Sequence, residues 1–452
     1  MTASGQGLWD DPKQARIASW MLVGLLMLLS GLMQSALALD GVLDIDVINF
    51  GLAAYDFDLL AHQPHPPGYP GYVLYLKVIH LLAPGLDPIE VAIWGARLSG
   101  LALVAVVYTV ARTALGGNAI GRPLACAALA VVHPILWYYG GDGQSHGADA
   151  VLTVLLFGAA VTAKQQPSAR RLVVFAAALG LAGAVRPTTI AVFAPVAVWL
   201  VWDRPIRDWL LAVGTGAAAI LIWLVPFVLW VGGYQTYARA SSALIGELFV
   251  ANFSVFGERA TIATLGANAL AALAATVLAI LPLASARPRG GDWSRAFALL
   301  GAGFALFYLL MFTAELGYFA GLAAAACLAP ITWRDRPRPV QIGRAVVVGV
   351  ASLLFIAVGP AAVPISGMVM TAPTLAQVAS TSQVFEHHGR LCELTEGQPT
   401  LLVTDNPMLA HNRWLPLRCP ELQVAVHLHQ LPYHPDLNVV LVFEDRGLRS
   451  LP

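Results

Sequence analysis

Long apolar runs separated by short polar breaks cover most of this chain. A helix needs about 20 apolar residues to cross the hydrocarbon core of a bilayer, and eleven runs approach or exceed that length. The first run is too long for the apolar region of a signal peptide, so we expect it to remain as a span. The predicted spans are Ile17–Leu39, Pro88–Val110, Pro123–Tyr139, Ala148–Ala163, Leu172–Val185, Thr188–Trp202, Trp209–Gly232, Leu265–Ala286, Ala296–Phe312, Gly317–Trp333 and Ala345–Ser366.

Basic residues are concentrated on one side of these spans, as expected when Lys and Arg stay in the cytoplasm. With a cytoplasmic N-terminus, sixteen basic residues lie inside and four lie outside. This bias requires that the break at Arg186-Pro187 separates two spans, and eleven spans then place the C-terminus outside. The inner residues are Lys13, Arg16, Arg112, Arg122, Lys164, Arg170, Arg171, Arg204, Arg207, Arg287, Arg289, Arg295, Arg334, Arg336, Arg338 and Arg344, and the outer ones are Lys77, Arg97, Arg239 and Arg259.

The composition agrees with a membrane protein. Hydrophobic residues make up 58% of the 452 positions and charged residues 12%, whereas a soluble domain carries about 25% charged residues. The excess apolar surface must face lipid. The formal net charge is zero, which gives no support for nucleic-acid binding. We therefore predict an all-α polytopic fold with about 11 transmembrane helices, occupying residues 1–366.

The C-terminal part, residues 367–452, has a different pattern. Three short segments rich in β-branched residues predict strands, so we expect a small extramembrane α/β domain outside the cytoplasm. Cys392 and Cys419 lie in this tail and either form a disulfide there or remain unpaired thiols. The strand segments are Leu401–Asp405, Leu422–Leu428 and Asn438–Phe443.

The first outer loop, within residues 40–87, carries the clearest candidate chemistry. Asp44 and Asp46 precede a segment whose spacing predicts a short surface helix from Asp46 to Tyr55, with Asp46, Asn49 and Phe50 on one face. A proline-rich turn follows and fixes the backbone. A carboxylate on such a rigid loop suits a general base. The alternative interpretation is a set of ordinary solvated acids beside a proline turn.

An acid three positions before Asn49-Phe50, followed by His62-Gln-Pro-His65-Pro-Pro-Gly-Tyr69-Pro70, resembles the first outer loop of bacterial GT-C glycosyltransferases. The branch in question is related to protein O-mannosyltransferases and lipid A aminoarabinose transferases. The resemblance implies a GT-C-like fold and an enzyme that takes a sugar from a polyprenyl-phosphate carrier at the outer face. It also implies that an acid of this loop activates the acceptor; Asp46 matches by position, with Asp44 as the fallback.

The second outer loop, residues 140–149, resembles the second acidic loop of the same family. Asp149 is the better positional match, and Asp142 departs from the expected pattern. Asp149 is predicted to orient the acceptor or the base; the alternative is that it only caps the next helix. Arg186 interrupts an apolar stretch, and the resemblance implies that its guanidinium grips the carrier phosphate. The alternative for Arg186 is a structural ion pair, with Asp149 as a candidate partner.

The remaining candidates lie near these loops. His62 and His65 are placed beside the carrier headgroup, and we expect Asn49 and Tyr69 to bind substrate. Tyr318, in Glu315-Leu-Gly-Tyr318, resembles a family position near the donor pocket, although an interfacial tyrosine has the same pattern. We expect no required cofactor. A divalent metal at His62, His65 and Asp46 is an alternative that lacks a third firm ligand.

These predictions describe an inverting glycosyltransferase of the bacterial inner membrane. Its partners are a polyprenyl-phosphate-linked sugar donor, a lipid, glycan or protein acceptor, and membrane lipid. A transporter or flippase is the main alternative, because a substrate path also needs charges within the membrane. The chain shows no pair of related halves of the kind that many transporters have. A membrane scaffold with a sensory tail is a further alternative.

Overall fold

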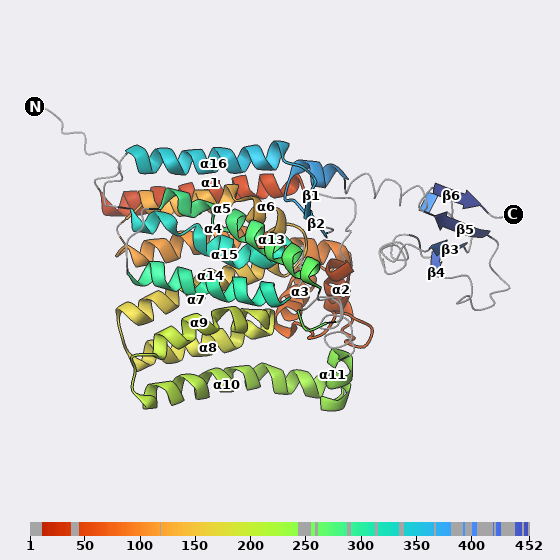
Figure 1. The fold of residues 1–452 in the computed structure, drawn as a ribbon, viewed down its shortest axis with the longest axis horizontal. Coiled ribbons are helices and arrows are strands. Elements are labelled where there is room, and N and C mark those ends of the chain that lie inside the picture. The colour runs from red at the N-terminus through yellow and green to blue at the C-terminus, as the bar shows by residue number, and fades with distance from the viewer. Residues whose placement is uncertain are drawn as a thin grey trace, which may run out of the picture.

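The structure, a computed structural model, describes residues 11–37, 45–117, 119–242, 255–257, 261–286, 291–311, 315–333, 339–365, 368–380, 392–393, 400–404, 419, 422–425, 439–444 and 447–450. Long helices dominate this part of the chain and lie alongside one another in a bundle (Figure 1). In that view α1 and α16 form one edge of the bundle and α10 the opposite edge.

Each of the eleven predicted spans corresponds to a helix or to a series of shorter helices. In the described residues seven helices are long and apolar enough to cross a membrane, and they are α1 (Pro12–Ser35), α4 (Pro88–Ala114), α7 (His146–Gln165), α10 (Ile206–Trp230), α13 (Ile262–Ala279), α14 (Asp292–Leu310) and α16 (Pro339–Val358). The other helices of the bundle are α5 (Gly121–Val132), α6 (Pro134–Tyr139), α8 (Ala169–Val185), α9 (Thr188–Val201) and α15 (Ala320–Ala326).

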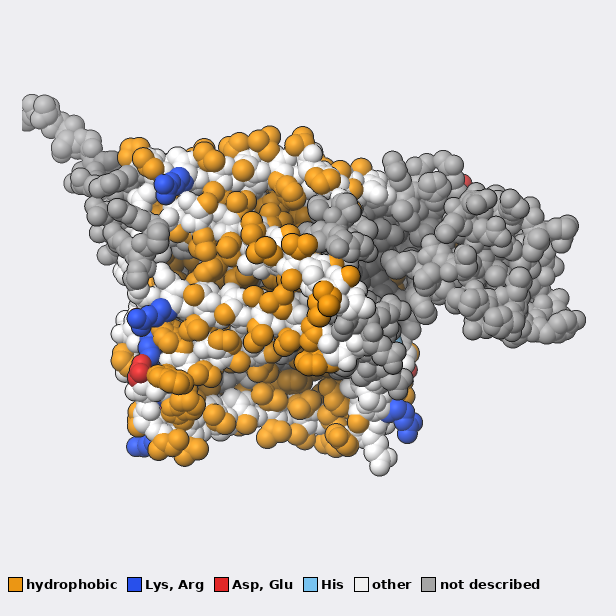
Figure 2. Space-filling view, viewed as in Figure 1, with side chains coloured by type: hydrophobic (Ala, Val, Ile, Leu, Met, Phe, Trp, Pro, Cys, Tyr) orange, Lys and Arg blue, Asp and Glu red, His pale blue; other side chains and the backbone are white. Residues whose placement is uncertain are grey.

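The outer surface of the bundle explains the composition. On α10 only Ala219 and Phe227 are buried, while leucine, isoleucine and valine side chains along the rest of the helix are exposed. Figure 2 shows hydrophobic side chains spread over the visible face of the bundle. Such a surface is favourable only against lipid. The protein is therefore a multi-pass membrane protein with the predicted all-α fold.

Two predicted spans are interrupted. The span expected at Pro123–Tyr139 is split at His133, because Pro134 disfavours helical backbone at the residue before it. The span expected at Gly317–Trp333 consists of the short helices η3 (Leu316–Phe319), α15 and η4 (Ala329–Thr332). These pieces are almost entirely buried; α15 packs against α7, η3 against α6 and α13, and η4 against α5. Protein neighbours, rather than lipid, surround this segment and tolerate its breaks.

The last predicted span extends too far. Helix α16 ends at Val358, and the strands β1 (Ala362–Ile365) and β2 (Met368–Thr371) follow it as an antiparallel pair. Pro360 cannot continue a helix, which is the physical reason for the early end. The expected domain boundary at residue 366 falls between these two paired strands, so that boundary stays a prediction.

The tail contains the expected strands. Strands β3 (Thr400–Thr404), β4 (Leu422–Ala425) and β5 (Val439–Glu444) start within one residue of the three predicted segments. Together with β6 (Gly447–Ser450) they form a four-stranded sheet in the order β4-β3-β5-β6, with β3 parallel to both neighbours and β6 antiparallel to β5. Cys392 and Cys419 are joined in a disulfide, which decides between the two alternatives left by the sequence.

Short helices gather at one end of the bundle. They are α2 (Ile45–Tyr55), α3 (Pro70–Leu82) and α11 (Tyr234–Ser241), on the right in Figure 1. Helix α2 begins within one residue of the predicted surface helix and ends at the same residue. The helix–loop–helix unit of α2 and α3 packs on α4, and α3 also packs on α8. This unit positions the acidic loop at the end of the bundle.

Candidate functional site

Asp46 lies in the first turn of α2 and faces the proline-rich loop. Its Oδ1 atom is 3.0 Å from Nδ1 of His65. On the other side of the imidazole, Nε2 of His65 is 3.2 Å from the hydroxyl of Tyr69. The ring of Phe50, one turn after Asp46, contacts the rings of both His65 and Tyr69 edge to face. The predicted face of α2 therefore contacts the predicted histidine.

The loop between α2 and α3 has a defined shape. Asp58 and Gln63 exchange backbone hydrogen bonds, and the Asp58 carboxylate accepts from two amides of the enclosed turn. Gly68 has a φ of 97°, and a side chain there would collide with Phe227 of α10. Tyr69 has a left-handed backbone and stands directly before Pro70 at the start of α3. These constraints hold His65 and Tyr69 against α2.

Arg186 is buried at the break between α8 and α9. Its side chain is held by neutral partners: Nη1 donates to Oγ of Ser145 (3.1 Å) and to Nδ1 of His146 (2.8 Å). The guanidinium also lies 4.7 Å from the centre of the Tyr318 ring. Only 4% of Arg186 is exposed. No carboxylate of the described residues forms an ion pair with it, so a permanent positive charge is buried without a contacting negative charge.

The proton positions on His146 follow from these contacts. An arginine can only donate, so Nδ1 of His146 must accept and the proton of the neutral ring must be on Nε2. That N–H points to Oε1 of Glu315, 2.9 Å away. Gln144 donates from Nε2 to the same oxygen at 2.8 Å. Arg186, His146 and Glu315 therefore form one connected hydrogen-bonded chain.

The two clusters belong to a single electrostatic site. Partial burial disfavours ionisation of Asp46, but the charge and hydrogen bond of His65, with smaller contributions from His146 and Arg186, hold its pKa below the ordinary value. Burial raises the pKa of Glu315 to about 7, against the opposing charge of Arg186, and Asp46 contributes to the rise. Burial likewise raises the pKa of Tyr69 to about 12, although Arg186 opposes it.

Asp149 has a different partner from the one suggested by the sequence. It lies in the first turn of α7 and is 6% exposed, but the N-cap residue of that helix is Ser145. Its Oδ1 accepts a hydrogen bond from the hydroxyl of Thr189 on α9. The first-turn position places Asp149 where the helix dipole favours a carboxylate, although Ser145 is the N-cap residue. The suggested ion pair with Arg186 is wrong, because the Arg186 guanidinium donates to Ser145 and His146 instead.

Some of the other predicted residues lie at this site and others lie away from it. Asn49 is 3% exposed on α2, and its side-chain oxygen has no hydrogen-bond partner in the described part of the chain. Tyr318 contacts Arg186 and His146. His62 is exposed in the turn before the cluster, with a φ of 57°. Asp142 accepts from the backbone amide of Gln144 and shapes the second loop. Asp44 lies outside the described residues.

Sequence reasoning missed the roles of His146, Gln144 and Glu315. His146 and Gln144 stand in a polar stretch directly before an apolar run, which was the available signal, whereas Glu315 was noted only as part of a short motif. Their partnership joins residues 169 and 171 positions apart. Within the described residues no group of three or more His, Cys, Asp or Glu side chains is arranged to hold a metal ion.

Comparisons with known proteins agree with this architecture. Residues 65–231 match the family described as dolichyl-phosphate-mannose-protein mannosyltransferase, a range that includes His65, Asp149 and Arg186 and begins after Asp46. No protein of curated function matches the sequence.

Two solved structures of ArnT from Cupriavidus metallidurans have a similar fold. The complex with undecaprenyl phosphate has a TM-score of 0.59 and 16% identity, over 89% of this chain and 85% of that chain. The apo state has a TM-score of 0.58 and 14% identity, over 91% and 86% respectively. The fold of this chain is ArnT-like, and the family match over residues 65–231 agrees with the resemblance drawn from the first outer loop.

Proposed function

We propose that this protein is an inverting glycosyltransferase that moves a sugar from a polyprenyl-phosphate donor to an acceptor at the outer face of the membrane. The family match over residues 65–231 and the ArnT-like fold support the enzyme class. The ArnT structure with bound undecaprenyl phosphate supports a donor carried on a lipid phosphate.

The buried charge of Arg186 is the observation that carries this proposal. A buried guanidinium held only by neutral groups is costly to keep in a folded protein. An anion bound beside it offsets that cost, and a planar guanidinium matches the geometry of phosphate oxygens. The aromatic ring of Tyr318 covers one side of the guanidinium. The phosphate of the donor is the anion that the proposed reaction supplies.

The chemistry uses Asp46 as the general base. An acceptor hydroxyl gives its proton to the Asp46 carboxylate while its oxygen forms a bond to the anomeric carbon of the sugar. The bond from that carbon to the phosphate oxygen breaks at the same time, and its electron pair leaves with the carrier phosphate. A single displacement of this kind inverts the anomeric configuration. The leaving phosphate is already an anion, so the site needs no strong acid.

The neighbours of Asp46 and Arg186 support these two roles. His65 keeps Asp46 ionised and fixes the direction of its carboxylate, and Tyr69 in turn fixes His65. Asn49 lies one turn after Asp46 on the same face of α2, and its buried side-chain oxygen has no hydrogen-bond partner among the described residues. Asp149 accepts a hydrogen bond from Thr189, which joins α7 to α9, and it acts electrostatically on Arg186.

The orientation follows from the distribution of basic residues. We place the N-terminus in the cytoplasm and the end of the bundle that carries α2 and α3 outside, in the inner membrane of a bacterium. The disulfide between Cys392 and Cys419 supports a tail outside the reducing cytoplasm.

The test is a transfer assay on the purified full-length protein in detergent. Wild-type protein should release polyprenyl phosphate from a polyprenyl-phosphate sugar, and Asp46→Asn should reduce the rate by about 10²- to 10⁴-fold. Asp56→Asn is the matched control, because this exposed acid directly follows α2 and should leave the rate unchanged. Transport of substrate into proteoliposomes without turnover, or full activity of Asp46→Asn, would refute the proposal.

A further inference from the structure

Glu315 is a second carboxylate at this site, and the reaction described above does not use it. It stands directly before η3 and accepts hydrogen bonds from both Gln144 and His146. Its carboxylate acts electrostatically on Arg186 although the two groups are not in contact. The link between them is His146, which is 1% exposed and hydrogen-bonded to both.

The imidazole of His146 is fixed in place by its neighbours. The rings of Tyr139 and Tyr318 flank it edge to face at 5.4 and 5.3 Å between centroids. Gly317 lies so close that a Cβ atom there would be 2.5 Å from the ring. Rotation of the imidazole away from Arg186 is therefore blocked. A change of charge at Glu315 must act through this fixed ring rather than by rearranging it.

The charge of Glu315 opposes anion binding at Arg186. When Glu315 is ionised, its negative charge polarises the N–H of His146, makes Nδ1 a stronger acceptor and partly neutralises the guanidinium. When Glu315 is protonated, Arg186 presents its full charge to an anion. The strength of the anion site therefore depends on the charge of a residue that does not itself touch the anion.

Donor and product differ in charge at the phosphate. The sugar-linked carrier is a phosphodiester with one negative charge, whereas the spent carrier is a monoester with about −1.5 to −2 charges near neutral pH. An arginine alone would hold the product more tightly than the donor. A nearby carboxylate repels the more highly charged product more strongly.

We infer that Glu315 and His146 are positioning residues that weaken the binding of the spent carrier phosphate to Arg186. This inference rests on the proposed function, and its consequence is faster release of the spent carrier. Several groups on other elements also face this cluster and contribute to its field. They are Asp46 on α2, His65 and Tyr69 of the loop before α3, Tyr139 on α6, Gln144 before α7, Asp149 on α7, Arg186 between α8 and α9, Tyr308 on α14, and Tyr318 on η3.

The test compares the KM for the donor with the inhibition constant for polyprenyl monophosphate. Glu315→Gln keeps a side-chain oxygen that accepts from His146 and removes the charge. We expect the inhibition constant of the monophosphate to fall about tenfold, the donor KM to fall less, and kcat to decrease because release slows. Asp142→Asn is the matched control, since it removes a carboxylate charge from the neighbouring loop before α7 without touching His146, and both constants should stay within about twofold of wild type.

The wild-type protein supplies an independent measurement. Because the pKa of Glu315 is raised to about 7, the ratio of the inhibition constant for polyprenyl monophosphate in the wild type to that in Glu315→Gln should rise between pH 6 and 8. The ionisation of the phosphate itself, whose second pKa is about 6, affects both proteins alike and cancels in this ratio. Equal changes in KM and inhibition constant, or no change in either, would overturn the inference while wild-type transfer still supports the proposed function. Absence of transfer and of monophosphate binding in the wild type would instead refute the proposed function itself.

Discussion

Charged side chains at the two ends of the helical bundle differ in burial and in the partners that hold them. At the end that carries α2 and α3, Arg186 is buried and is held by a hydroxyl, an imidazole and an aromatic ring. At the other end, Lys164 forms an ion pair with Asp203 at 2.9 Å, and the Asp203 side chain is 75% exposed. A charge in water costs little, whereas a buried charge that has no counterion in the described part of the chain indicates a functional role.

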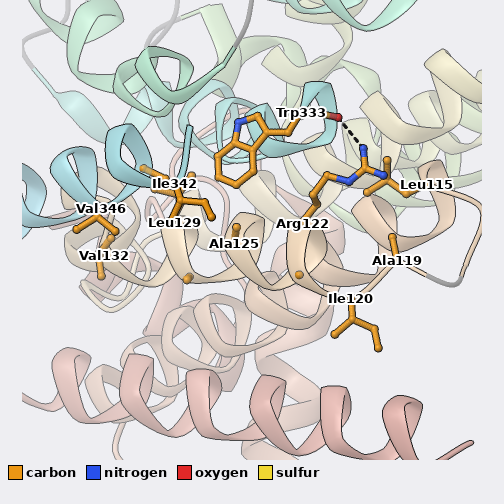
Figure 3. A pocket seen from close by; sticks show the side chains of 14 residues that line it. Leu115, Ala119, Ile120, Arg122, Ala125, Leu129, Val132, Trp333, Ile342 and Val346 are labelled. Atoms are coloured by element: carbon orange, nitrogen blue, oxygen red, sulfur yellow. Dashed lines mark hydrogen bonds between the residues drawn. The ribbon is translucent and has the colours of Figure 1, made fainter. Parts of the chain in front are cut away.

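The cavity in Figure 3 differs from the surroundings of Arg186 in the polarity of its walls. It lies near the loop between α4 and α5 and has a volume of about 750 Å³. Its walls are mostly apolar, with Leu129, Ile342 and Val346 among them. Arg122 borders it and donates to the backbone carbonyl of Trp333 at 2.7 Å. A groove with this lining suits lipid chains, and it lacks the convergent polar groups found around Arg186.

The strongest test of the contrast is the removal of the buried charge. Arg186→Met should reduce kcat/KM for a polyprenyl-phosphate donor by about 10²- to 10³-fold. The reason is that, among the residues that the structure describes, no other Lys or Arg contacts Ser145 and His146. Arg186→Lys should retain part of the activity, since an ammonium keeps the charge and loses the planar fork. Steady-state kinetics on the purified variants measure both. Arg204→Met, at the opposite end, is the control, and an equal loss there would remove the distinction.

The pairing of Asp46 with His65 gives the next largest effect. His65→Gln removes the cation that holds the pKa of Asp46 below its ordinary value, so that pKa should rise. The base form of Asp46 is present above its pKa, and the acid limb of the pH–rate profile should therefore move to higher pH. At neutral pH the rate should fall about tenfold because the carboxylate loses the imidazole that fixes its direction. An unchanged acid limb would show that His65 does not set the ionisation of the base.

Alanine substitutions of one glycine at each end of the bundle measure how closely the neighbouring side chains pack. Gly317→Ala places a methyl group against the His146 ring and should lower the melting temperature in detergent and the transfer rate, at a cost of about 1–3 kcal/mol. Gly343→Ala on α16 has open space around the added carbon and should be neutral or slightly stabilising. Equal effects of the two substitutions would contradict the close packing at His146.

The smallest expected effect is at the exposed ion pair. Lys164→Met should change the free energy of unfolding by about 0–1 kcal/mol and leave transfer unchanged, because Asp203 is largely in water. Melting curves at low and high salt measure the electrostatic part. A large loss of transfer activity would assign a functional role to this end as well.

The sequence by itself determined the membrane architecture. Apolar runs, the basic bias and the break at Arg186-Pro187 located the helices, and the bounds of the helix from Asp46 to Tyr55 were predicted within one residue. That helix was expected on the surface, but most of its side chains are buried against α3 and α4. These features are local, because the cost of placing each residue in lipid or water depends mainly on that residue and its near neighbours. The same reason accounts for the correct strands in the tail.

Only the tertiary structure decided which side chains meet. The contact of His146 with Glu315, the neutral partners of Arg186 and the bond from Thr189 to Asp149 each depend on how distant helices pack. The broken segment before Trp333 depends on it too, since burial among other helices replaces the continuity that lipid would demand. Packing is set by the shapes of many side chains together, and a linear pattern of polar and apolar residues does not contain that information.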